Sequence, residues 1–211
     1  MIAFDLDDTL YKERDFLASG RRAVTRKFAA SLGLKPEELY DLMMVAADPF
    51  DCLVERSGGT ISIPQILDTY RNHLPEIALD RSTEYVLKTL KDRGEQLAII
   101  TDGRAVTQRN KIAALGLERF VDSEAIIVSE EIGAEKTSPL PFQILMQRFP
   151  AAAPFTYVGD NPAKDFIHPR QLGWRTVMLA DTHCLNIHPQ HLTNPNVLAA
   201  TTIDTLDALL G

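Results

Sequence analysis

Asp5, Asp7 and Thr9 place three oxygen-bearing side chains at alternating positions close to the N-terminus. They follow a short apolar segment, residues 2–4, that is typical of a buried strand. A strand ending here would place two carboxylates and a hydroxyl at its carboxyl end, where open α/β sheets bind their ligands. Crowded carboxylates repel one another, and a bound divalent cation relieves that repulsion. The pattern predicts either a cation site or, as the alternative, an acidic turn after a first strand.

Three later segments repeat this arrangement of an apolar run that stops at polar residues. The runs are apolar on both faces, as a parallel sheet covered by helices requires, and comprise residues 97–100, 125–128 and 155–158. The polar residues that follow them are, in chain order, Thr101, Asp102, Gly103, Lys136, Asp160 and Asp165. Because the carboxyl ends of neighbouring parallel strands share one edge, we expect these residues to converge on a single pocket.

Helical patterns separate the apolar runs. We expect helices at residues 82–93, 105–115, 141–149, 163–172 and 203–210, with a kink at Pro169 in the fourth. Residues 176–179 should add another strand, and Asn196 to Ala199 an edge strand. Alternating strands and helices predict an α/β fold with a doubly wound parallel sheet.

One long helical block interrupts this alternation. Residues 15–78 contain helical patterns at 16–32, 35–47 and 63–73, and no strand pattern. We expect this block to be an all-helical cap inserted after the first strand, with residues 1–14 and 79–211 forming the α/β core. A cap attached beside Asp5 and Asp7 could exclude water from the pocket.

Composition excludes several classes of protein. The net charge of −7 over 211 residues argues against a nucleic-acid partner, and no apolar run is long enough to span a membrane. Acidic residues begin at Asp5, so no secretory leader is expected. Two widely separated cysteines exclude a redox pair and a zinc cluster, and suit the cytoplasm. We expect a cytoplasmic monomer or homodimer.

The expected pocket would combine a carboxylate cluster, one lysine, a hydroxyl and backbone amides, which suits Mg²⁺ together with a phosphoryl group. Each part also has a plain structural explanation. Thr101 could begin a turn and helix cap, Lys136 could be a solvated loop residue, and Asp160 could cap a helix. Only the ordered set favours the functional interpretation.

That ordered set resembles the motifs of the haloacid dehalogenase-like hydrolase superfamily, in the branch with a helical cap after the first strand. The segment Asp5-Leu-Asp-Asp-Thr9 matches the first motif, DxDxT. Thr101 matches the second motif, Lys136 the third, and Gly159-Asp160-(x)4-Asp165 the fourth. The chain departs from the family pattern at two places. In the third motif the lysine is often followed directly by proline, but here Thr137 and Ser138 stand between Lys136 and the proline, and in the first motif Asp8 stands where glycine is frequent.

The resemblance implies a role for each matched residue. Asp5 would be the nucleophile that forms an aspartyl-phosphate, and Asp7 the general acid and base. Mg²⁺ would be bound by the Asp5 carboxylate, the Asp7 backbone carbonyl and Asp160. The phosphoryl oxygens would be bound by Thr101, by the free amides of Asp102 and Gly103, and by Lys136. Thr9 and Asp165 would orient these groups.

The sequence therefore predicts a Mg²⁺-dependent phosphatase acting on a small phosphorylated metabolite. Three alternatives remain open. A phosphomutase would use the same core on a sugar phosphate. A metal-free haloacid dehalogenase would leave Asp7 and Asp160 without a role. A non-enzymatic, receiver-like phospho-switch would place its aspartate on a middle strand and would lack a large cap.

Overall fold

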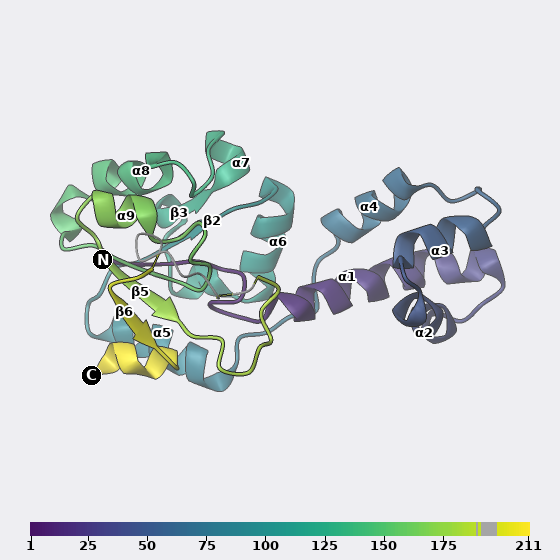
Figure 1. Cartoon of the computed structure of the whole chain (residues 1–211), viewed down its shortest axis with the longest axis horizontal. Coiled ribbons are helices and arrows are strands. Elements are labelled where there is room, and N and C mark those ends of the chain that lie inside the picture. The colour runs from purple at the N-terminus through teal and green to yellow at the C-terminus, as the bar shows by residue number, and fades with distance from the viewer. Residues whose placement is uncertain (189, 191–197) are drawn as a thin grey trace. The chain divides into compact units, whose positions relative to one another are not determined.

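The computed structural model describes residues 1–188, 190 and 198–211. It divides into two compact units, one formed by residues 1–14 with 78–211 and the other by residues 15–77. The boundaries differ by one residue from those expected of the core and the cap. Figure 1 follows both units along the chain.

The first unit contains a six-stranded parallel sheet, so the predicted α/β fold with a doubly wound parallel sheet is confirmed. Its order is β3-β2-β1-β4-β5-β6. The strands are β1 (Ile2–Phe4), β2 (Leu97–Thr101), β3 (Ile126–Val128), β4 (Thr156–Gly159), β5 (Arg175–Leu179) and β6 (Thr201–Ile203). Strands β2 and β3 are entirely buried, as their apolar runs indicated.

Strand β1 lies at the point where the direction of winding reverses. Ile2 pairs with Leu97 of β2 on one side and with Thr156 of β4 on the other. Successive strands then lead away from β1 in opposite directions. In open parallel sheets such a reversal leaves a crevice at the carboxyl ends of the strands. Asp5, the residue after β1, lies in that crevice.

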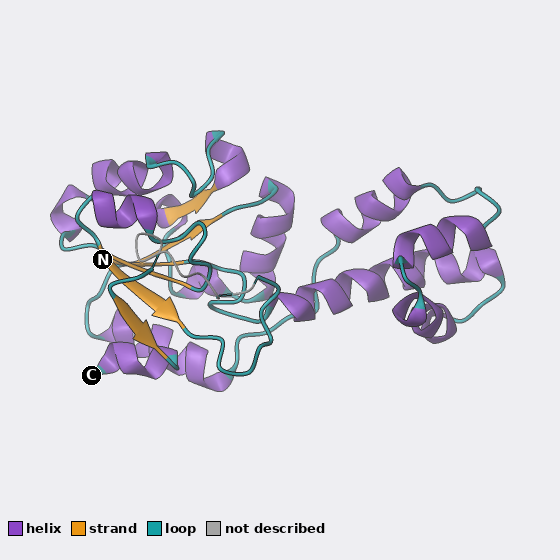
Figure 2. Ribbon diagram, in the orientation of Figure 1, coloured by secondary structure: helices purple, strands orange, loops and turns teal. Residues whose placement is uncertain are grey.

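Helices cover both faces of the sheet, and Figure 2 shows α5 on the opposite side from α8 and α9. The helices of this unit are α5 (Arg81–Asp92), α6 (Ala105–Ala114), α7 (Ser129–Ile132), α8 (Leu140–Arg148) and α9 (Ile167–Gln171). Short 3-10 helices are η2 (Leu117–Arg119), η3 (Ser123–Ala125), η4 (Pro150–Ala152) and η6 (Leu206–Leu210). Helix α5 shows why these segments fold locally, because the Asp80 side chain accepts from Thr83 N at 2.7 Å and caps its first turn.

Three expectations for the second half of the chain need correction or lie outside the described residues. The helix expected over 163–172 is shorter than expected and comprises only α9. Pro169 is the third residue of α9, in the first turn, where a backbone N–H has no helical acceptor and its absence costs no hydrogen bond. The edge strand expected from Asn196 falls partly outside the described residues, and β6 begins at Thr201. The helix expected over 203–210 is the 3-10 helix η6.

The second unit is helical and has a core of its own. Its elements are α1 (Glu13–Phe28), which begins in the first unit, η1 (Ala29–Leu32), α2 (Pro36–Val45), α3 (Pro49–Arg56) and α4 (Ile63–Asn72). The core residues are Val24, Phe28, Ala29, Leu39, Met43, Leu53, Ile61 and Ile66. Helix α3 was not among the helices expected in this block, although Asp48 accepts from Phe50 N and Asp51 N and Pro49 occupies the first turn. Among the described helices, none has the length and apolar character needed to cross a membrane.

Candidate active site

Three carboxylates from two strand ends gather at the crevice. Asp5 follows β1, Asp160 follows β4, and Asp165 lies in the loop before α9. Each offers an oxygen within 4.8 Å of the others, and all three residues are buried. Asp165 is fixed by Asn161, whose backbone N donates to Asp165 Oδ2 at 2.9 Å. The structure therefore brings Asp5 and Asp160 together, as the sequence predicted.

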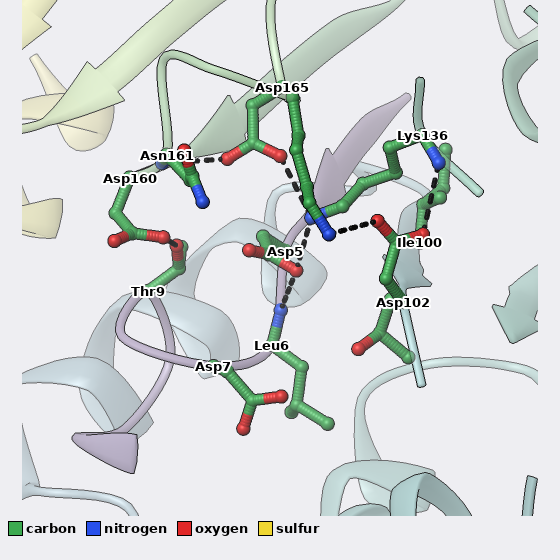
Figure 3. A network of polar contacts seen from close by, with 12 residues as sticks. Asp5, Leu6, Asp7, Thr9, Ile100, Asp102, Lys136, Asp160, Asn161 and Asp165 are labelled. Carbon is green, nitrogen blue, oxygen red and sulfur yellow. Dashed lines mark hydrogen bonds and ion pairs between the residues drawn. The ribbon is translucent and has the colours of Figure 1, made fainter. Parts of the chain in front are cut away.

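Lys136 supplies the positive charge at the centre of this cluster. Its Nζ lies 2.8 Å from Asp5 Oδ1 and 2.8 Å from Asp165 Oδ1, and the residue is 3% exposed. Figure 3 shows its amine between the two carboxylates. Burial acts to lower the pKa of Lys136, but Asp165 and Asp5 outweigh it and raise that pKa above its usual value. Lys136 is therefore a cation at neutral pH and not the solvated loop residue of the alternative interpretation.

One lysine does not neutralise three buried carboxylates. Burial raises the pKa of Asp5 well above its ordinary value, and Lys136 offsets only part of that effect. Burial, with Asp165 nearby, raises the pKa of Asp160 to about 7. A divalent cation between Asp5 and Asp160 would stabilise the ionised form of both carboxylates. Their hard oxygen donors suit such an ion, so the residues present fit the divalent metal that the resemblance implies.

Polar side chains from other segments surround Asp160. Thr9 Oγ1 donates to Asp160 Oδ1 at 3.4 Å (Figure 3). Asn186 Nδ2 donates to Asp160 Oδ2 at 2.8 Å, and Gln190 Nε2 donates to the Asp160 carbonyl at 2.8 Å. Asp160 is thus held from both sides, by the loop after β1 and by the loop after β5.

Asp7 is bound by a separate set of side chains. Its Oδ1 accepts from Lys111 Nζ at 2.7 Å and from the Tyr11 hydroxyl, and its Oδ2 accepts from Gln108 Nε2 at 2.9 Å. Figure 3 shows its carboxylate pointing away from Asp160 and Asp165. Burial acts to raise the pKa of Asp7, but the Lys111 charge together with the hydrogen bonds from Lys111, Tyr11 and Gln108 outweighs it, and the pKa is lowered.

The segment after β2 differs from its expected arrangement. We predicted that Gly103 would offer a free amide to an anion, but Gly103 N donates to Ser129 Oγ at 2.9 Å. Asp102 Oδ1 accepts from Lys136 N at 3.0 Å, so this side chain fixes the lysine loop. The Thr101 hydroxyl accepts from Gln108 Nε2, and Thr101 is 1% exposed. The expected set of free backbone amides therefore loses one donor, because the Ser129 hydroxyl at the neighbouring strand end accepts from the Gly103 amide.

A cavity of about 110 Å³ opens onto this site. The described residues that line it are Asp5, Asp7, Asp8, Glu13, Asp102, Lys136, Asp160, Asn161, Lys164 and His188. Thr101 is not among these lining residues, in contrast to what we expected of a phosphoryl ligand. Burial and the nearby Asp7 raise the pKa of Glu13 to about 7.

Sequence reasoning missed Gln108, Lys111 and Asn186. Gln108 and Lys111 stand on the buried face of α6 beside Ile112, and a polar pair on an apolar helix face was a readable signal. Asn186 lies in a loop, where neither periodicity nor a motif marks it. Asp8 stands where the first motif frequently has glycine. It adopts a positive φ of 56° and accepts from Glu13 N and Ile187 N, which ties α1 to that loop.

Comparison with known proteins shows the family of the chain. Residues 2–179 match the model of the haloacid dehalogenase-like hydrolase family, and the chain belongs to that family. A solved structure of a HAD phosphatase from Thermococcus onnurineus superposes with a TM-score of 0.62 at 21% identity, covering 99% of this chain and 94% of the other. At that identity the likeness concerns the fold.

Two curated relatives are phosphatases by name. Glyceraldehyde 3-phosphate phosphatase of Methanocaldococcus jannaschii is 35% identical over 193 residues, covering 84% of this chain and 83% of the relative. Ribulose-1,5-bisphosphate 5-phosphatase of Halopiger xanaduensis is 27% identical over 182 residues, covering 84% and 71%. The protein is therefore an enzyme of the hydrolase class whose relatives include phosphatases for small phosphate esters.

Proposed function

We propose that this protein is a Mg²⁺-dependent phosphatase that hydrolyses a small phosphomonoester through an aspartyl-phosphate on Asp5. The observation that carries this proposal is the position of Lys136 Nζ, 2.8 Å from both Asp5 and Asp165, with Asp160 in the same buried cluster. A nucleophilic carboxylate, a fixed cation and a set of metal ligands are the parts that phosphoryl transfer through an enzyme carboxylate needs.

Asp5 carries out the first step. Its Oδ1 accepts from Leu6 N at 2.8 Å and contacts Lys136, so Oδ2 is the oxygen proposed to attack. A bond forms between Oδ2 and phosphorus while the ester P–O bond breaks. Asp7 must hold a proton at this point, retained from the water of the preceding turnover, and it gives that proton to the leaving oxygen. In the second step Asp7 takes a proton from water, the water oxygen attacks phosphorus, and the Asp5–phosphorus bond breaks to release phosphate.

The remaining residues bind and orient. Mg²⁺ held by Asp5, Asp160 and the Asp7 backbone carbonyl would neutralise negative charge on the phosphoryl oxygens. Lys136 adds a second positive charge on the Asp5 side, held in place by Asp165. Thr101 does not line the cavity; its Oγ1 accepts from Gln108, so Thr101 anchors that side chain and is not proposed as a phosphoryl ligand.

The helical unit of residues 15–77 is proposed as the cap that excludes water and selects the substrate. The two phosphatase relatives act, by their names, on phosphate esters of short sugars. We therefore propose glyceraldehyde 3-phosphate and related short-chain phosphate esters as the first substrates to test.

Phosphate release tests the proposal directly. The purified protein would be incubated with Mg²⁺ and a panel of triose, pentose, hexose and amino-acid phosphates, with Asp5→Asn as the blank. We expect release from at least one short ester, with loss of activity in excess chelator. No release from any ester would overturn the proposal, and dependence on a sugar bisphosphate activator without net release would favour the phosphomutase.

A further inference from the structure

Helix α6 places two buried polar side chains against Asp7. Lys111 Nζ lies 2.7 Å from Asp7 Oδ1, and Gln108 Nε2 lies 2.9 Å from Asp7 Oδ2. The two residues are three positions apart and therefore project from the same face of the helix. Each oxygen of the Asp7 carboxylate thus has its own donor on one rigid element.

Burying Lys111 and Gln108 costs folding free energy, so their position calls for a functional reason. Lys111 is 3% exposed and Gln108 is 2% exposed, on a helix whose other buried side chain is Ile112. A buried ammonium group loses its hydration, and an apolar side chain of similar volume is often neutral or better for stability. The partner of Lys111 is a carboxylate that lines the cavity, so Lys111, which does not line it, supports a residue of the cavity wall.

The orientation of the Gln108 amide follows from its neighbours. An ionised Asp7 carboxylate can only accept hydrogen bonds, so the Gln108 atom that faces it must be the NH₂ group. The same group donates to Thr101 Oγ1 at the end of β2 and lies 3.3 Å from the Asp102 carbonyl. Gln108 is therefore anchored on the sheet and presents a fixed donor to Asp7.

We propose that Lys111 and Gln108 are positioning residues that act through Asp7, holding its carboxylate in the orientation from which it exchanges protons with the leaving group and with water. This proposal rests on the function proposed above. It assigns to α6 an indirect part in the proton-transfer steps, through Asp7, in addition to its packing on the sheet.

The substrate's leaving group provides a test that a packing role would not pass. An alkyl phosphate such as glycerol phosphate needs its leaving oxygen protonated, whereas p-nitrophenyl phosphate releases a stable anion. The parameter kcat/KM reports the steps up to release of the leaving group. We expect Lys111→Met to lower kcat/KM about 100-fold for glycerol phosphate and less than about threefold for p-nitrophenyl phosphate. We expect the same pattern, with a smaller loss, for Gln108→Met.

The matched control is Arg109→Met on the same helix. Arg109 forms an exposed pair with Glu131 at 2.7 Å, and its replacement should leave both kcat/KM values unchanged. Lys111→Arg, which keeps the charge, should recover most of the loss. In an Asp7→Asn background neither Lys111→Met nor Gln108→Met should lower kcat/KM further, because both act through the residue already removed.

Equal losses on the two substrates, or a full additional loss in the Asp7→Asn background, would overturn the positioning role. If Lys111→Met does not fold, Gln108→Met carries the same comparison, because it removes no charge. A wild-type protein that releases phosphate from no ester, neither these two nor any of the panel above, instead contradicts the proposed function, so the two failures are distinguishable.

Discussion

Lys136 Nζ lies 2.8 Å from Asp165 Oδ1, and both side chains are almost completely buried. Asp165 comes from the loop before α9, and Lys136 comes from the loop between α7 and α8. The pair therefore joins two loops of the α/β unit and fixes the lysine against Asp5. Replacing either partner should affect both stability and turnover.

Removing the lysine should destabilise the fold. We expect Lys136→Met to lower the free energy of unfolding by about 3–5 kcal/mol at pH 8, because it leaves buried carboxylates without their cation. The loss should be smaller at pH 5, where buried carboxylates with raised pKa values take up protons. Urea denaturation at the two pH values measures this. Lys164→Met, which removes a lysine whose side chain is 37% exposed, is the control and should change little.

Gly159 should not tolerate a side chain. A Cβ at this position would overlap Asp165 Oδ2 and lie 2.8 Å from Asp165 Cγ. We expect Gly159→Ala to displace Asp165, to lower kcat about 10- to 100-fold and to destabilise the protein by about 1–3 kcal/mol. Steady-state kinetics and thermal denaturation measure these effects. In an Asp165→Ala background the added methyl group has no carboxylate to meet, so an undiminished effect there would show that the clash lies elsewhere.

Magnesium should stabilise the protein more at pH 8 than at pH 5.5. The pKa of Asp160 is about 7 in the metal-free fold, above its ordinary value of 3.8, so the folded state retains a proton that the unfolded chain loses. Stability of the metal-free protein should therefore fall as pH rises from about 4 to about 7. Because Mg²⁺ competes with that proton, its stabilising effect should grow over the same range.

Thermal denaturation with and without Mg²⁺ checks this dependence. A concentration of about 10 mM would roughly saturate a site of millimolar affinity. Asp160→Asn removes both the titrating group and a proposed ligand, so the shift in melting temperature with Mg²⁺ should largely vanish at both pH values. A shift of equal size at pH 5.5 and pH 8 in the wild type would contradict the assignment of Asp160 as a ligand.

Asp5→Asn should abolish turnover while the protein remains folded. An amide is a far weaker nucleophile than a carboxylate, so we expect kcat to fall by a factor of about 10³ or more. Asp165 still provides a partner for Lys136, so the melting temperature should stay near that of the wild type. Phosphate release and circular dichroism measure the two properties. Activity within about tenfold of wild type would rule out covalent catalysis by Asp5.

Much of the fold could be predicted from local patterns. The doubly buried strands β2 and β4 are short apolar runs ending at polar residues, and glycines mark the ends of α5 and α6. Less local features escaped prediction. Helix α3 was not among the expected helices, although Asp48 and Pro49 mark its start. The helix expected over 163–172 begins only at Ile167, so residues 163–166 are not helical.

The sequence by itself determined which residues come to the carboxyl edge of the sheet, since alternation of strands and helices places every strand end there. It thereby brought Asp5, Lys136, Asp160 and Asp165 to one site. Only the tertiary structure decided how their atoms are partnered. The occupied Gly103 amide and the bonds from Gln108 and Lys111 to Asp7 depend on packing between α6 and the strand ends, which no local pattern specifies.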